Sequence, residues 1–172
     1  MVELKKVAVG GTFDELHKGH KFLLKKAFEI GDRVLIGLCT DEFVKKLGKP
    51  HLTASYNERL DELKEFLIEL GVSERAEIIP LNEPFGPSAT DVTIQGLIVS
   101  QETESTAIKI NEQRKRNRLR ALRIVTVNMV PSENCGPIST TRIRRGEMDR
   151  EGRLFGANYP SLQRKVKASK SQ

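Results

Sequence analysis

Residues suited to binding phosphate groups are concentrated in two short segments of the chain. The first segment reads Gly10-Gly11-Thr12-Phe13-Asp14-Glu15-Leu16-His17-Lys18-Gly19-His20. Its paired glycines let the backbone approach a ligand closely. His17 and His20 are three residues apart, so one helical turn can aim both imidazoles at one place, where each can donate a hydrogen bond to a phosphoryl oxygen. Gly19 opens the next helix, whose free N–H groups add to an anion site.

The second segment reads Gly136-Pro137-Ile138-Ser139-Thr140-Thr141-Arg142-Ile143-Arg144. Ser139 is a typical N-cap residue, and the hydroxyls of Thr140 and Thr141 follow it at the start of a helix. Hydroxyls and free N–H groups bind phosphate oxygens, and an arginine one turn further on adds charge-assisted bonds. The segment therefore predicts a phosphate cradle. A capped surface helix with solvated arginines is the alternative.

Other chemistries fit the two segments less well. His51 is the only other histidine, and no further His or Cys cluster supports a metal site at His17 and His20. Two ordinary surface histidines are the other alternative. The patterns GxxxxGK[ST] and GxGxxG do not occur, which disfavours a P-loop or a dinucleotide-binding fingerprint.

An alternating pattern of elements positions these segments. Apolar runs predict strands at residues 7–11, 33–39, 76–81, 96–100 and 122–130, and helical spacing predicts helices at 19–30, 41–47, 56–70, 104–119 and 139–148. Such alternation implies parallel strands, so we expect an α/β fold with a doubly wound, five-stranded, Rossmann-like parallel sheet. Ligands of such sheets bind at the carboxyl ends of the strands, so the loops after the first and fifth strands should form the site.

The composition fits one domain with an anionic ligand. The chain has 172 residues and a net charge of +6. We predict a domain over residues 1–160 and a basic, disordered tail over residues 161–172. No apolar run is long enough for a membrane span and no signal-peptide pattern is present, so we expect a cytoplasmic protein with free thiols at Cys39 and Cys135. The oligomeric state is left open, a monomer included.

A basic stretch between Arg114 and Arg123, together with the basic tail, raises the question of a nucleic-acid partner. No aromatic residues are interleaved with these charges, and no standard nucleic-acid motif is present. We therefore interpret the stretch as a solvated helix face and expect no nucleic-acid partner.

Taken together, the two segments resemble the nucleotidyltransferase superfamily. Gly11-Thr12-Phe13-Asp14 with His17-Lys18-Gly19-His20 resembles its HxGH signature, and Ile138 to Arg144 resembles its ISSTxxR signature. The resemblance covers roughly residues 6–150. Within the superfamily, residues 98–103 (IVSQET) and 111–114 (NEQR) resemble the archaeal and eukaryotic phosphopantetheine adenylyltransferases. The bacterial type carries an Arg-Gly-Leu-Arg segment near this point, and whether Arg114 replaces those arginines is left open.

The resemblance implies a reversible reaction of coenzyme A biosynthesis. The phosphate of 4′-phosphopantetheine attacks the α-phosphorus of ATP and gives dephospho-coenzyme A and pyrophosphate. Mg²⁺ is implied as an ion carried with ATP, with no metal site in the protein. A cytidylyltransferase, or an adenylyltransferase for nicotinamide or flavin mononucleotide, is the alternative on the same fold. A nucleic-acid-binding protein is the alternative outside this enzyme class.

The same resemblance implies roles for individual residues. The lysine that reaches the phosphates comes from the loop before the third helix, and of Lys45, Lys46 and Lys49 we favour Lys49 because it lies in a Gly/Pro loop. The catalytic candidates are His20, Thr12 and Lys49. The ATP-binding candidates are Gly11, Thr12, Phe13, His17, Gly19, His20, Ser139, Thr140, Thr141 and Arg144, and the acceptor-binding candidates are Thr12, Lys46, Lys49 and Ser88.

The aromatic content favours a flexible acceptor over a second nucleotide. The chain has no Trp, two Tyr and seven Phe. Phe22, Phe28 and Phe66 fall at positions expected to face the core. Few aromatic residues then remain for a second stacking surface, although Phe85 in the loop over residues 82–90 is available. A mononucleotide acceptor needs a surface on which its base stacks, whereas an amide chain needs a narrow channel with small polar partners such as Ser88.

Overall fold

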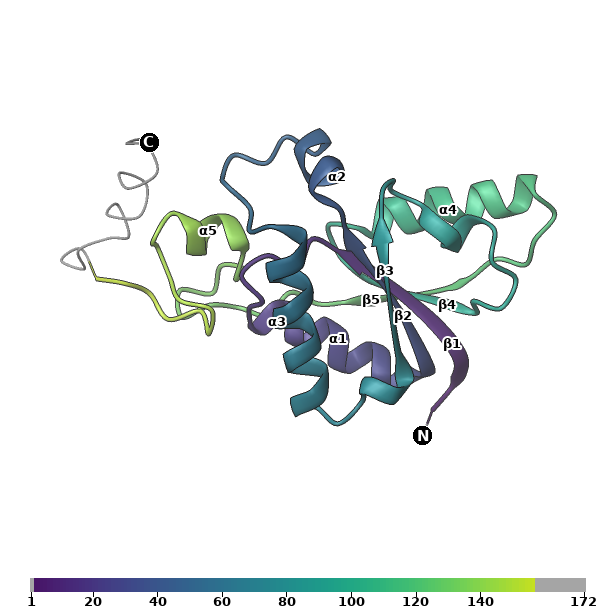
Figure 1. The fold of residues 1–172 in the computed structure, drawn as a ribbon, viewed down its shortest axis with the longest axis horizontal. Coiled ribbons are helices and arrows are strands. Elements are labelled where there is room, and N and C mark those ends of the chain that lie inside the picture. Colours follow the sequence, from purple (N-terminus) through teal and green to yellow (C-terminus); the bar gives the residue numbers. More distant parts are fainter. Residues whose placement is uncertain (1, 157–172) are drawn as a thin grey trace.

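The computed structural model of the protein describes residues 2–156, and its core is one parallel sheet (Figure 1). The sheet order is β3-β2-β1-β4-β5, and every pairing between neighbours is parallel. The predicted doubly wound α/β fold is therefore confirmed. The strands are β1 (Leu4–Gly11), β2 (Gly31–Cys39), β3 (Ala76–Leu81), β4 (Gly96–Ser100) and β5 (Arg123–Val127).

Helices cover both faces of the sheet. One core contains the buried sides of α1 and α3 and the side chains of Val34 and Ile36, and the other contains the buried side of α4 and that of Leu35. Strand β2 is thus buried on both faces, which explains its continuous apolar run. The helical elements are α1 (Lys18–Ile30), α2 (Asp41–Lys46), α3 (Tyr56–Glu69), α4 (Glu104–Arg116) and α5 (Thr140–Arg144), with 3-10 turns η1 (Ser73–Arg75) and η2 (Gly86–Ala89).

Three elements end three or four residues earlier than predicted, each for a local reason. Helix α4 ends at Arg116 because Arg118 takes a left-handed conformation (φ 57°). Strand β5 ends at Val127, whose partner Ser100 is the last residue of β4, so no further pairing is available. Helix α5 spans only Thr140–Arg144 because Gly146 (φ 72°) turns the chain away.

The prediction that Phe22 faces the core is wrong. Its side chain is 46% exposed, whereas Phe28 and Phe66 are buried as predicted. The buried stripe of α1 contains Leu24, Ala27 and Phe28. Phe22 precedes Leu24 by two residues, about 200° around the helix, and therefore faces away from that stripe.

The remaining expectations about the chain as a whole have mixed outcomes. Cys39 is buried, Cys135 is exposed, and both are free thiols as expected. Within residues 2–156, no helix has the length and apolar character needed to cross a membrane. The predicted tail over residues 161–172 lies outside the described residues.

Arg114 corrects the interpretation of the basic stretch as a uniformly solvated face. Lys115 and Arg116 are exposed as expected, but Arg114 is only 1% exposed. Its guanidinium donates to the carbonyl oxygens of Ser88 (2.9 Å), Asp91 (2.8 Å) and Arg120 (2.7 Å). It therefore binds the loop around η2 to α4, and the structure gives it a role in folding.

We expect replacement of Arg114 by Met to lower the free energy of unfolding by about 3 kcal/mol, because it leaves buried carbonyl groups without a donor. Urea denaturation is the measurement, and Arg116→Met, an exposed arginine of the same helix, is the control. Equal stability of the two variants would contradict the structural role of Arg114.

Candidate active site

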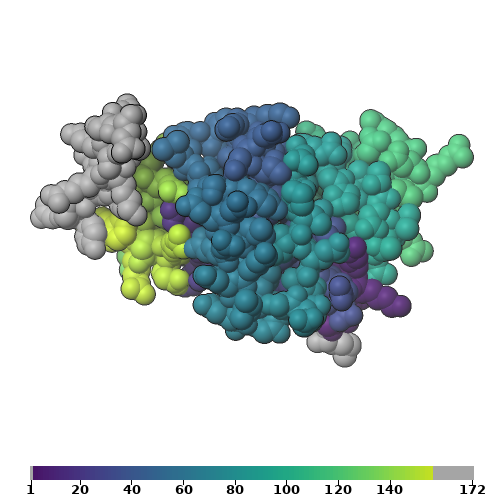
Figure 2. All heavy atoms as spheres, in the orientation of Figure 1, coloured from purple at the N-terminus to yellow at the C-terminus, as the bar shows by residue number. Residues whose placement is uncertain are grey.

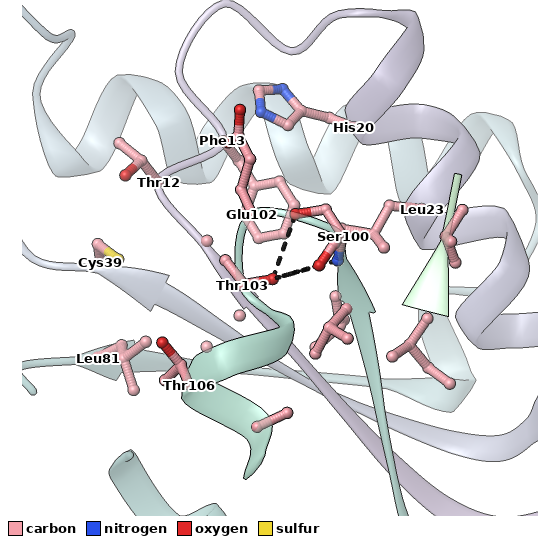
Figure 3. Close-up of a pocket in the computed structure, with 18 of the residues that line it drawn as sticks. Thr12, Phe13, His20, Leu23, Cys39, Leu81, Ser100, Glu102, Thr103 and Thr106 are labelled. Carbon is pink, nitrogen blue, oxygen red and sulfur yellow. Dashed lines mark hydrogen bonds between the residues drawn. The ribbon is translucent and has the colours of Figure 1, made fainter. Parts of the chain in front are cut away.

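A cavity of about 700 Å³ opens where the sheet changes direction of winding. The chain runs outward from β1 through β2 to β3, then returns to the other side of β1 for β4 and β5. The cavity is lined by Thr12 after β1, Cys39 at the end of β2 and Ser100 at the end of β4 (Figure 3). This location at the switch point is the expected ligand site of a doubly wound sheet, and the volume suits a nucleotide-sized ligand.

His17 and His20 are fixed in this cavity by the start of α1. His17 is the N-cap of the helix, and its Nδ1 accepts hydrogen bonds from the backbone N–H groups of Gly19 (3.1 Å) and His20 (3.4 Å). In return, the N–H of His17 donates to Nδ1 of His20 (3.4 Å). The two rings stack with 3.7 Å between centroids, and the ring of Phe13 meets His20 edge-on at 5.4 Å.

These bonds decide which nitrogen carries the proton. Because Nδ1 accepts in both neutral imidazoles, Nε2 carries the hydrogen in both. Burial is the main cause that lowers the pKa of His17 to about 4, with a further contribution from Arg150 that Asp14 opposes. Burial also lowers the pKa of His20, helped by His17, Lys49 and Arg150. At neutral pH the site therefore holds two uncharged rings whose Nε2–H groups are donors.

Gly19 is needed for this arrangement. A Cβ at Gly19 would lie 2.9 Å from Cε1 of His17, so any side chain would push the capping imidazole out of place. The glycine of the first segment therefore makes room for the His17 ring, in addition to opening the helix.

The second segment reaches the same cavity. Ser139 caps α5 through its Oγ, which accepts from the N–H of Arg142 (3.2 Å), as the sequence predicts. The Oγ1 of Thr140 donates to the carbonyl oxygen of Asp14 (2.9 Å), which joins the second segment to the first. Ser139, Thr140 and Thr141 all line the cavity.

The structure brings most of the sequence-predicted residues together. Lys49 lines the cavity and its charge lowers the pKa of His20, whereas Lys45 and Lys46 are exposed and are not among the lining residues. Ser88 is a buried lining residue, and Phe85 lies nearby. The predicted residues that line the cavity are Gly11, Thr12, Phe13, His17, Gly19, His20, Lys49, Ser88, Ser139, Thr140 and Thr141.

Arg144 is the predicted ATP-binding residue that the structure does not bring to the cavity. Its guanidinium contacts Asp14 and Glu15 instead, and it borders a second, smaller depression rich in acidic residues. Its role as a phosphate ligand stays a prediction.

Sequence reasoning missed two buried residues that hold the site together. Asp14 is fully buried and accepts from Arg144 and from the N–H of Ala54 (3.1 Å). Arg59, 1% exposed on α3, donates to the carbonyl oxygens of Thr12 (2.9 Å) and Ala54 (2.9 Å). Asp14 belongs to the first segment, so its position in the sequence could have indicated a role in the site. Arg59 lies in an ordinary helical pattern, which gives no indication of its hydrogen-bond partners.

Arg59 also fixes the end of the neighbouring strand. It donates to the carbonyl oxygen of Cys39 (2.8 Å), the last residue of β2, and pairs with Asp41 (2.9 Å) in the first turn of α2. The buried guanidinium thus sets the positions of two strand ends that line the cavity.

Ser100, Glu102 and Thr103 belong to the segment over residues 98–103 that carries part of the resemblance, but the sequence analysis does not assign them, or Thr106, to the site. Ser100, Glu102, Thr103 and Thr106 line the cavity opposite Thr12 and His20 (Figure 3). The Oγ of Ser100 lies 3.2 Å from Oγ1 of Thr103, so the two hydroxyls brace each other at the start of α4.

A doubly wound parallel sheet with imidazole donors after β1 and hydroxyls before α5 at one switch-point cavity defines a nucleotide-binding enzyme of the nucleotidyltransferase class. A family model described as cytidylyltransferase-like matches residues 8–146. The chain belongs to the cytidylyltransferase-like family.

Relatives within this family are similar over most of their length. The chain is 42% identical over 149 residues to a phosphopantetheine adenylyltransferase of Methanopyrus kandleri, covering 87% of this chain and 94% of the relative. It is 46% identical over 154 residues to one of Methanosarcina mazei, covering 88% and 97%. A solved structure from Archaeoglobus fulgidus, described as a protein with unknown function, has a TM-score of 0.63 and 31% identity, covering 71% of this chain and 97% of that one.

The lowered pKa of His17 predicts a pH-dependent stability. In the unfolded chain a histidine takes up a proton near pH 6.5, whereas folded His17 does so near pH 4. Between these values the unfolded state binds more protons, so the free energy of unfolding should fall as the pH drops from about 6.5 to 4, by on the order of 3 kcal/mol.

Denaturant titrations between pH 5 and pH 7 measure this slope before most carboxylates protonate. His17→Asn keeps an N-cap acceptor without a titrating ring, so its slope should be shallower. Identical slopes for the variant and the unaltered chain would show that His17 titrates normally.

Proposed function

We propose that this protein transfers the adenylyl group of ATP to 4′-phosphopantetheine and releases pyrophosphate. The observation that carries the proposal is that both signature segments line one cavity in a chain 42–46% identical to relatives named phosphopantetheine adenylyltransferase. The product is dephospho-coenzyme A, and the reaction is reversible. Two free thiols suit a reducing, cytoplasmic compartment.

The reaction is a direct displacement. A phosphate oxygen of 4′-phosphopantetheine forms a bond to the α-phosphorus of ATP, and the bond from that phosphorus to the β-bridging oxygen breaks, so pyrophosphate leaves with the electron pair. A phosphate monoester with a second pKa of about 6 is largely a dianion at pH 7, so no general base is required. Catalysis rests on positioning and on stabilising the charge that develops at phosphorus.

His20 stabilises that charge by donating from Nε2–H to an α-phosphate oxygen. Its place in the cavity and its lowered pKa support this role, since a neutral ring stays a directional donor across physiological pH. Thr12 holds the acceptor phosphate and bridges to the α-phosphate through its hydroxyl. Lys49 supplies positive charge to both phosphates, a role supported by its electrostatic effect on His20.

The remaining ATP phosphates lie against the second segment. Thr140 and Thr141, with Ser139 beside them, contact the β- and γ-phosphates, and His17 contacts the nucleotide phosphates from the other side. Thr140 does so through its backbone N–H in the first turn of α5, because its hydroxyl donates to Asp14. Gly11, Phe13 and Gly19 shape the backbone around them. The convergence of these residues on one cavity supports the assignment.

Mg²⁺ enters with ATP and is ligated largely by triphosphate oxygens and water. Its charge would offset that of the leaving pyrophosphate.

The acceptor arm lies in the part of the cavity between α4 and the η2 loop. Ser88 offers a small polar group there, and Phe85 with Ala107 and Ile110 offers apolar contact. A flexible amide chain suits such a channel. A mononucleotide acceptor would need aromatic residues on which its base could stack, and Phe85 is one of few there.

We expect ATP with 4′-phosphopantetheine to give a kcat/KM at least about tenfold above that with nicotinamide or flavin mononucleotide, which needs only about 1.4 kcal/mol of differential transition-state binding. Pyrophosphate release with ATP or CTP against this panel of acceptors is the measurement. A higher kcat/KM with either mononucleotide, or with CTP as donor, would replace the proposed function by its alternative on the same fold.

We expect His20→Ala to lower kcat by roughly 10²–10³-fold, as the loss of one preorganised donor to a developing charge does. The KM for ATP should change less, because the contact strengthens in the transition state. Lys18→Ala, an exposed neighbour on the same turn, is the matched control. Near-normal turnover in a folded His20→Ala protein would remove His20 from the mechanism.

A further inference from the structure

The turn between β1 and α1 has an unusual backbone. Phe13 and Glu15 both have left-handed conformations, with φ of 50° and 51°. Neither is a glycine, so both conformations are costly and need support from their surroundings. Phe13 is anchored by burial of its ring, at 1% exposure. The residue between them, Asp14, carries a fully buried carboxylate.

Arg144 contacts the acidic side chains of this turn with all three of its guanidinium nitrogens. Its Nε and Nη2 donate to the two carboxylate oxygens of Asp14 (3.2 and 2.8 Å), and its Nη1 lies 3.1 Å from Oε1 of Glu15. Arg150 pairs with Glu15 from the same side (2.8 Å) and with Glu62 of α3. Each nitrogen of the Arg144 guanidinium is therefore directed at an acidic group of the β1–α1 turn.

The position of Arg144 separates it from the phosphates. It borders the second depression, whose other walls include Glu58, Asp61 and Glu62, and such a surface repels a triphosphate. If Arg144 turned toward the cavity, the buried carboxylate of Asp14 would lose its charged partner, which is strongly unfavourable. In Figure 2 the C-terminal segment that contains Arg144 and Arg150 (yellow-green) lies against the blue region that contains α3, in line with the pair between Arg150 and Glu62.

We propose that Arg144 is a positioning residue that acts through Asp14, and not a ligand of the ATP phosphates. The buried pair joins the β1–α1 turn to α5, beside the bond from Thr140 to the carbonyl oxygen of Asp14. It thereby sets the imidazoles of His17 and His20 at a fixed distance from the hydroxyls of the second segment. The inference rests on the proposed function, in which these two groups bind the same phosphates.

A double-mutant cycle tests the pairing. Asp14→Asn keeps an acceptor for the N–H of Ala54 but removes the charge, and Arg144→Met removes the guanidinium but keeps an apolar stem. We expect each variant to lower kcat by roughly 10–100-fold, as small misplacements of reacting groups do. The double variant should be no slower than the slower single variant, because both remove the same interaction. The KM for ATP should stay within about threefold in all three, since ground-state phosphate contacts remain.

The matched control is Arg145→Met, the exposed arginine next in sequence, which should leave kcat unchanged. Arg144→Lys keeps the charge without the fork and should recover part of kcat. Thermal unfolding of each variant identifies any loss of active enzyme through unfolding. ATP affinity measured by calorimetry gives a readout that needs no turnover.

A different pattern would overturn the inference. If Arg144→Met raises the KM and Kd for ATP more than about tenfold while Asp14→Asn does not, or if the two losses multiply in the double variant, Arg144 binds phosphate directly. The cycle is run with whichever acceptor the unaltered chain turns over. If 4′-phosphopantetheine is not an acceptor, the proposed function is contradicted, but the cycle with another acceptor still decides the role of Arg144.

Discussion

A buried carboxylate is the constraint on which the site depends. Asp14 is fully removed from water, so the charge of its carboxylate must be matched by donors, and these come from two separate parts of the chain: Arg144 of α5 and the N–H of Ala54 before α3. The carbonyl oxygen of Asp14 also accepts from Thr140, at the start of α5. An uncompensated charge at this depth would cost several kcal/mol. The carboxylate therefore enforces the approach of segments about 130 residues apart in sequence, because the fold can satisfy Asp14 only when they are in place.

The electrostatic design of the cavity follows from how α1 begins. A histidine at the N-cap is unusual, since Ser, Thr, Asp and Asn are the preferred residues. Here Nδ1 of His17 accepts from two backbone N–H groups, which fixes one tautomer of the neutral ring. Burial lowers the pKa of His17 and so keeps the ring neutral. A carboxylate at the same position would repel phosphates, and a hydroxyl would not stack on His20. The same residue thus caps the N-terminus of α1 and provides an uncharged donor at the cavity.

The sequence predicted the fold and most of the site, and the exceptions share a physical cause. Apolar runs and the Gly and Pro residues that bound them located the strands to within a few residues. The runs are clear because parallel strands buried on both faces are almost continuously apolar. The residues that line the cavity were visible because glycines, histidines and hydroxyls stood in two compact segments. Arg59 and Arg114 were missed because their partners are backbone carbonyls, which every residue has and no pattern marks. For Arg144 the sequence shows a residue type that commonly binds phosphate, but it does not show where the side chain points. That direction is set by Asp14 and Glu15, which lie in the β1–α1 turn.

The two hydrogen bonds of Ala54 limit how far the loop between α2 and α3 can move. Its N–H is bound by Asp14 and its carbonyl oxygen by Arg59, so this one peptide segment cannot rotate freely. At the other end, α2 ends at Lys46 with Leu47 as its C-cap, and Gly48 takes a left-handed conformation (φ 61°). Only the residues from Lys49 to Thr53 remain between these fixed points, and an extended chain gains at most about 3.4 Å per residue. The backbone that carries Lys49 is therefore a short segment of limited reach, and the largest movements open to the charge of Lys49 are those of its own side chain.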